Sequence, residues 1–168
     1  MDGIENFTVV FSETRTEEEH QRKLKEMLKK VQILGSNVTI NEEVRFGENV
    51  TLCENTTLSS ASSVGSNSLI RNTKLGVESR VGRNCIVGPK EDGISKIGHS
   101  VTIGDGCTIY ASYICSGATV GDNVFIGRNV VIAAPVIIKN GVKIPRWTII
   151  KNSTQVEELY RKQILLGE

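Results

Sequence analysis

Aliphatic side chains recur at every sixth position through most of this chain. The pattern runs from Leu34 to Ile150 in twenty units. It breaks three times: with five-residue steps after Ile70 and Ile109, and with a ten-residue step after Val87. We call these positions the markers: Leu34, Ile40, Phe46, Leu52, Leu58, Val64, Ile70, Leu75, Val81, Val87, Ile97, Ile103, Ile109, Ile114, Val120, Ile126, Ile132, Ile138, Ile144 and Ile150. Six residues suit one short strand and one turn, so the period predicts an all-β solenoid.

Two further positions of the repeat have a fixed character. Glycine follows the marker in half of the units, as in Gly76 and Gly98, and a small or branched residue stands four places after the marker. We expect the marker and this small residue both to point inward, with a bend between them. Glycine is expected to give the bend its backbone freedom. Alternating large and small side chains would then fill a narrow tube.

Composition agrees with such a tube and excludes several classes of protein. Hydrophobic residues make up 39% of the chain and aromatic residues only 5%, while glycine occurs 16 times. Lys and Arg (20) nearly balance Asp and Glu (19), so the charge gives no reason to expect a nucleic-acid partner. No apolar run approaches the ~20 residues needed to cross a bilayer, and the N-terminus lacks a secretion signal. We therefore expect a cytoplasmic protein without a membrane partner.

The repeat resembles that of the hexapeptide-repeat transferase superfamily. The stretches IGHSVTIGDGCTI (97–109) and VGDNVFIGRNVVI (120–132) are similar to its consensus, and the resemblance covers residues 34–154. It implies a left-handed parallel β-helix with three units per coil, and hence six to seven coils. It also implies assembly into a homotrimer.

The segments on either side of the repeat predict closing helices. Residues 1–33 are expected to form a strand over 4–11 and an amphipathic helix over 17–32, which begins with a capping box at Thr16 and Glu19. Residues 155–168 are expected to form a second helix, begun by a capping box at Thr154 and Glu157. Both helices are expected to cover open ends of the tube, which would otherwise expose unpaired strand edges.

Outward-facing positions suggest a subunit interface. Tyr113, Val131 and Ile149 each precede a marker at intervals of eighteen residues, so three units per coil places them on one face. An apolar stripe of this kind predicts contact with other copies of the chain. A weaker second stripe consists of Phe125, Ile86 and Leu69. The ten-residue step adds a polar loop over 89–96, the one outward excursion of the array.

Candidate catalytic residues are few. Acyltransferases of the superfamily use a general base, usually histidine, and the chain has only His20 and His99. His20 is expected to pack on the N-terminal helix. His99 falls near a coil corner, with Asp105 as the sole nearby candidate to orient it. Catalytic zinc needs three protein ligands, and two histidines cannot supply the three of the superfamily's carbonic anhydrases, so we expect no metal site.

The four cysteines form no metal-binding or disulfide pattern. Cys85 and Cys107 occupy small inward positions, where a buried thiol acts as a small hydrophobic filler. Cys53 and Cys115 occupy the position after the marker, and the sequence does not indicate how exposed they are.

Two functions of different classes remain open. The stretches 67–88 and 107–127 resemble the C-terminal β-helices of sugar-1-phosphate nucleotidyltransferases. They favour a non-catalytic oligomerising or regulatory β-helix linked to sugar-nucleotide metabolism, with a separate catalytic partner chain.

The alternative is an acyltransferase that uses acetyl-CoA as co-substrate to modify a sugar or an amine, with His99 as base. Its acyl donor would find phosphate-binding groups in Lys90, Lys96, Arg128 and Arg146. Trp147 would stack on the adenine or, more simply, pack against the terminal helix.

Overall fold

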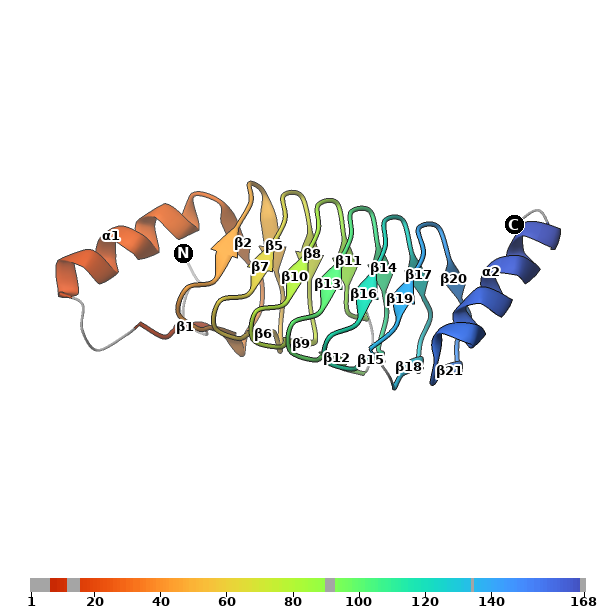
Figure 1. The fold of residues 1–168 in the computed structure, drawn as a ribbon. Helices are drawn as coiled ribbons and strands as arrows, with labels where there is room; N and C mark the ends of the chain where they lie inside the picture. The colour runs from red at the N-terminus through yellow and green to blue at the C-terminus, as the bar shows by residue number, and fades with distance from the viewer. Residues whose placement is uncertain (1–6, 12–15, 90–92, 134, 167–168) are drawn as a thin grey trace.

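The computed structural model describes residues 7–11, 16–89, 93–133 and 135–166. It shows a tube of short parallel strands with one helix near each end (Figure 1). The expected fold class of a parallel β-solenoid with six to seven coils is confirmed, because the three sheets contain eight, six and seven strands. Among the described residues, no helix is long and apolar enough to span a bilayer.

Three parallel sheets form the walls of the tube, and each coil adds one strand to each wall. Sheet A contains β1 (Phe7–Val9), β3 (Val38–Ile40), β6 (Thr57–Leu58), β9 (Thr73–Leu75), β12 (Ser95–Ile97), β15 (Tyr113–Ile114), β18 (Val131–Ile132) and β21 (Ile149–Ile150). Sheet B contains β2 (Val31–Ile33), β5 (Val50–Leu52), β8 (Leu69–Ile70), β11 (Ile86–Val87), β14 (Thr108–Ile109), β17 (Phe125–Ile126) and β20 (Lys143–Ile144). Sheet C contains β4 (Arg45–Phe46), β7 (Ser63–Val64), β10 (Arg80–Val81), β13 (Thr102–Ile103), β16 (Thr119–Val120) and β19 (Ile137–Ile138).

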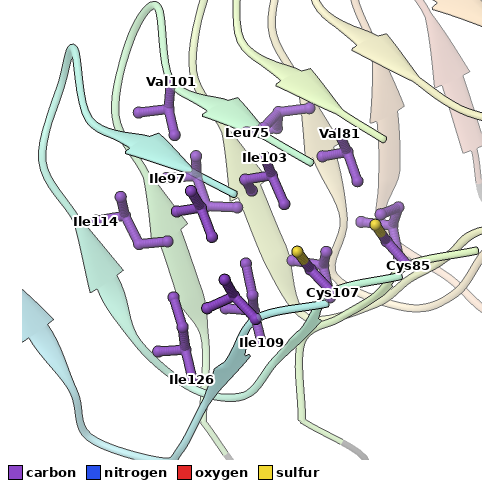
Figure 2. Close-up of a cluster of buried hydrophobic side chains, with 14 of the residues drawn as sticks. Leu75, Val81, Cys85, Ile97, Val101, Ile103, Cys107, Ile109, Ile114 and Ile126 are labelled. Atoms are coloured by element: carbon purple, nitrogen blue, oxygen red, sulfur yellow. The ribbon is translucent and has the colours of Figure 1, made fainter. Parts of the chain in front are cut away.

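The markers build the core, as the period predicts. All of them except Leu34 and Phe46 are buried, and they stack in register from coil to coil; Ile103, for example, pairs with Val81 and Val120. The close-up in Figure 2 shows Ile109, Ile114 and Ile126 converging inside the tube beside Cys107. The small residues four places after the markers are also buried, apart from a few near the ends.

The first marker is placed wrongly by the sequence pattern. Leu34 is 46% exposed, whereas Val31 is buried and Ile33 packs partly against the core. In β2, Ile33 pairs with Leu52, so Ile33 rather than Leu34 continues the inward row. Ile33 and Ile40 are seven residues apart instead of six. A fixed six-residue count back from Ile40 therefore reaches Leu34 and misses Ile33.

Most glycines after the markers serve a different purpose from the one expected. Gly76 and Gly98 do not have positive φ, so their position requires no glycine-specific conformation. A Cβ on Gly76 would instead lie 2.3 Å from the backbone oxygen of Gly98 in the next coil. These glycines are needed because successive coils approach too closely there for a side chain.

The left-handed conformation occurs two residues later, at the third position after the marker. Asparagine is the commonest residue there, as in Asn37 and Asn55, with φ of 59° and 52°. In the shortened unit after Ile70 it stands one place earlier, at Asn72, with φ 44°. The side chains of these three residues form a ladder in which each amide donates to the one in the next coil, at 3.1 and 3.0 Å. Asparagine tolerates this conformation better than most residues, so these corners need no glycine.

The N-terminal helix differs from its prediction. Helix α1 (Glu17–Leu28) starts with the expected capping box at Thr16, but it ends before Val31, which belongs to β2. No residue of α1 is buried, and only Met27 packs against the core. Figure 1 shows the helix extending away from the tube, so the expected cover of the first coil is wrong. The strand expected over 4–11 is β1, and residues 4–6 lie outside the described residues.

The C-terminal helix does cover its end of the tube. Helix α2 (Ser153–Leu166) buries Val156 in the core, and the side chain of Gln163 bonds to both the backbone N–H and the carbonyl of Lys143 on β20. Its start differs from the expected capping box at Thr154. Asn152 accepts from the backbone N–H of Gln155, whose own side chain accepts from the N–H of Lys151.

Candidate functional site

The corner after sheet C has a ladder of acidic and amide side chains. The Oδ1 atom of Asp105 accepts from the backbone N–H of Arg83 at 2.7 Å, and Asp122 accepts in the same way from Asp105 at 2.8 Å. Asn140 accepts from Asp122 at 2.9 Å. Each side chain thus caps a backbone N–H one coil earlier, which stabilises the corner.

Asp105 also forms an ion pair with the guanidinium of Arg83, at 2.9 Å. The hydrogen bonds from the backbone and side chain of Arg83 lower the pKa of the Asp105 carboxyl below its ordinary value. Asp105 is therefore committed to its own corner. It does not orient His99, which is the role that we expected for it from the sequence.

His99 performs the same capping task at the corner after sheet A. Its Nδ1 atom accepts from the backbone N–H of Val77 at 3.1 Å, and its own N–H donates to Ser116 Oγ at 3.0 Å. A neutral imidazole that accepts at Nδ1 carries its proton on Nε2. The exposed nitrogen therefore has no lone pair to take a substrate proton, and this geometry does not favour a general base.

Of the candidate phosphate-binding cations that the structure describes, only Arg128 and Arg146 lie at the same corner of the tube. Arg128 and Arg146 come from the same corner in successive coils, two residues after the paired Ile126 and Ile144. Lys96 lies on the outer face of sheet A, between Lys74 and Tyr113 in the register. Lys90 lies outside the described residues.

The expected apolar stripe lies in register on sheet A. Tyr113 pairs with Val131, and Val131 pairs with Ile149. Together with Trp147 and Ile94 they line an open depression of about 440 Å³. Trp147 is 71% exposed and occupies a left-handed corner, φ 66°, so it lies beside the stripe. We call these five residues the sheet A patch.

The sequence did not predict that Trp147 and Ile94 belong to this patch. Neither has the outward position before a marker that identified Tyr113 and Ile149. Both residues lie at corners beside sheet A, and the six-residue pattern does not predict which way a corner side chain points. Their hydrophobic character in polar surroundings was the available signal.

The second stripe is less continuous than the first. On sheet B, Leu69 pairs with Ile86, but Thr108 separates Ile86 from Phe125. The ring of Phe125 instead meets Tyr110 edge to face, with centroids 5.7 Å apart. Phe125 thus already has a partner within the coil array.

The cysteines behave as expected from their positions. Cys85 and Cys107 are fully buried in adjacent coils, and their thiols donate to the carbonyls of Gly104 and Gly121. The hydrogen bond with Cys107 and burial raise the pKa of the Cys85 thiol. Burial likewise raises the pKa of the half-buried Cys53 and Cys115. The hydrogen bond with Cys85 lowers the pKa of the Cys107 thiol, but Cys107 is fully buried and cannot reach a substrate. The other three thiols have raised pKa values and are poor nucleophiles, so none of the four is a candidate catalytic group.

His20 lies on α1, stacked on the ring of Phe11 with centroids 4.5 Å apart. This agrees with a packing residue. Within the part of the chain that the structure describes, no three His, Cys, Asp or Glu side chains are grouped to hold a metal ion.

Comparisons with known proteins find relatives of this repeat. Residues 117–152 match the family described as bacterial transferase hexapeptide (six repeats). The chain is 35% identical over 101 residues to the bifunctional protein GlmU of Dichelobacter nodosus (strain VCS1703A), a match that covers 57% of this chain and 20% of that protein. The chain thus spans about a fifth of this curated relative. The predicted resemblance to the hexapeptide-repeat transferase superfamily is confirmed.

Solved structures include similar chains. A putative acetyltransferase of Bacillus cereus is 17% identical, with 95% of this chain and 92% of that chain covered and a TM-score of 0.41. A hexapeptide transferase family protein of Anaplasma phagocytophilum is 14% identical, with 81% and 93% covered and a TM-score of 0.45.

Proposed function

We propose that this chain is a non-catalytic β-solenoid that assembles copies of itself into a homotrimer and serves as an oligomerising or regulatory unit in sugar-nucleotide metabolism. The resemblance to the β-helices of sugar-1-phosphate nucleotidyltransferases supports the metabolic setting. A separate catalytic partner chain would carry out the chemistry.

The sheet A patch carries this proposal. Tyr113 and Ile149 are exposed on a flat sheet face, and Trp147 stands beside them. Aromatic side chains are enriched in protein interfaces, and apolar residues gathered on one face stabilise association when they are buried together. Earlier on the same sheet the outward residues are Lys74 and Lys96, so the apolar surface is confined to the C-terminal coils.

The corner role of His99 supports the absence of catalysis. Its Nδ1 is engaged with the backbone of Val77, and the candidate acidic partner Asp105 is paired with Arg83. An acyltransferase needs a base whose free nitrogen accepts the substrate proton. The other histidine, His20, lies on α1 and is stacked on the ring of Phe11.

The assembly is tested by replacing Ile149 with aspartate. We expect the wild-type chain to sediment as a trimer of the 18.4 kDa chain and Ile149→Asp as a monomer, because a charge cannot be buried unpaired in an apolar interface. Trp147, the only tryptophan, provides a second measurement. Its emission should shift to longer wavelength and become more accessible to acrylamide in the variant.

Ile137→Asp is the matched control, because Ile137 is 69% exposed on sheet C, outside the patch. It should leave the oligomer and the Trp147 emission unchanged. A monomeric wild type, or dissociation by Ile137→Asp alone, would contradict the proposed interface.

The absence of acyl transfer is tested with acetyl-CoA. We expect no saturable binding in calorimetry and no thioester consumption with amino sugars, in the wild type or in His99→Ala. Thioester turnover in the wild type that His99→Ala removes would instead establish the acyltransferase alternative.

A further inference from the structure

The outer face of sheet C carries two arginines on either side of a serine. Arg45 pairs with Ser63, and Ser63 pairs with Arg80, so the three residues stand on neighbouring strands at the same height. The residue after each of them points into the core, so these side chains point outward. Alternate strands lie about 10 Å apart, a span that two arginine side chains can bridge toward one another.

Neither guanidinium has an acidic partner among the described residues. The ion pairs there involve Lys30, Lys139, His20 and Arg83, and Arg83, three residues from Arg80, binds Asp105 at 2.9 Å. Arg45 and Arg80 have no hydrogen bond or ion pair from their side chains. Two guanidinium groups that form no ion pair thus lie on either side of one hydroxyl.

The three residues line an open depression of about 680 Å³ together with Thr102, Ser100, Ala61 and Glu78. Ala61 occupies the left-handed corner position at φ 56°, where the two neighbouring coils have Glu43 and Glu78. Its small side chain leaves the corner beside Ser63 open. Glu78 is the only carboxylate in the lining, and it accepts from the Ser100 hydroxyl at 3.3 Å.

We propose that this depression binds the phosphoryl group of a small molecule between Arg45 and Arg80. The planar guanidinium matches two oxygens of a phosphate, and such charge-assisted hydrogen bonds are stronger than neutral ones. Ser63 and Thr102 supply hydroxyl donors between and beside the arginines. The site lies on a different sheet from the sheet A patch and does not depend on the proposed assembly.

The binding is tested by titrating the full chain with inorganic phosphate, pyrophosphate and a sugar 1-phosphate in a low-salt buffer. Arg45→Gln and Arg80→Gln should each weaken binding about tenfold, since each removes a charged hydrogen-bonding partner. Glu78→Gln should strengthen it, because it removes the one repulsive charge in the lining. The probe that binds most tightly identifies whether a single phosphate, a diphosphate or a phosphate ester is the preferred ligand.

Arg161→Gln is the matched control, because Arg161 is exposed on α2, far along the chain from this site. It should bind each probe as the wild type does. Equal weakening by Arg161→Gln would show attraction to overall charge, and unchanged affinity in both Arg45→Gln and Arg80→Gln would overturn the proposed site. Arg45→Lys keeps the charge and should still weaken binding, because the two-pronged geometry is lost.

Discussion

Replacing Ile103 with alanine should lower the free energy of unfolding by about 2–5 kcal/mol, because it leaves a cavity in the middle of the tube. Ile103 is 2% exposed and stacks between Val81 and Val120, so the neighbouring coils cannot fill the space without breaking their ladders. Urea unfolding at one fixed protein concentration measures the change.

The adjacent Thr102→Ala is the control for this substitution. Thr102 lies on the same strand but points outward and is exposed. Its replacement should change stability by no more than about 0.5 kcal/mol. Equal losses in both variants would mean that Ile103 is not a core residue and that the inward marker row is wrong.

Replacing Gly82 with alanine should destabilise the chain by about 3 kcal/mol, at the upper end of overpacking costs. The new Cβ would lie 2.5 Å from the backbone carbon and oxygen of Gly104 in the next coil. Backbone atoms held in a sheet cannot rotate away as a side chain can, so the two coils must separate locally. The loss is measured by thermal and urea unfolding.

Gly141→Asn is the comparison for Gly82→Ala. Gly141 has φ 73° and nothing within 4 Å of a Cβ, and Asn123 takes the same corner position one coil earlier with φ 55°. This variant should stay within about 0.5 kcal/mol of the wild type. A larger loss at Gly141 than at Gly82 would show that corner conformation, and not coil contact, determines where glycine is required.

The fold was largely predictable because one local rule repeats along the chain. The spacing of Ile, Val and Leu assigned the inward residues in nearly every coil. The exceptions lie at the first coil, where Leu34 was taken for Ile33, and at α1, which was expected to pack on the tube. Both concern the ends, where no preceding coil enforces the register.

The candidate site was less predictable. His99 and Asp105 are close in sequence, but each caps a different corner. The partners of His99 are 22 and 17 residues away, at Val77 and Ser116. These separations differ because of the ten-residue and five-residue steps, so a regular count of eighteen does not find them. Arg45 and Arg80 likewise line one depression although the offset between their coils includes a shortened step.

The sequence by itself determined that this chain forms a tube of short strands and which side chains fill it. Inside and outside follow from the residue's own place in the six-residue unit, which is a local property. The tertiary structure decided which outward side chains share a face, which way the corner residues point, and that His99 is held by a backbone N–H. These features depend on the total length of each coil and on contacts between coils. The sequence of a single six-residue unit contains neither.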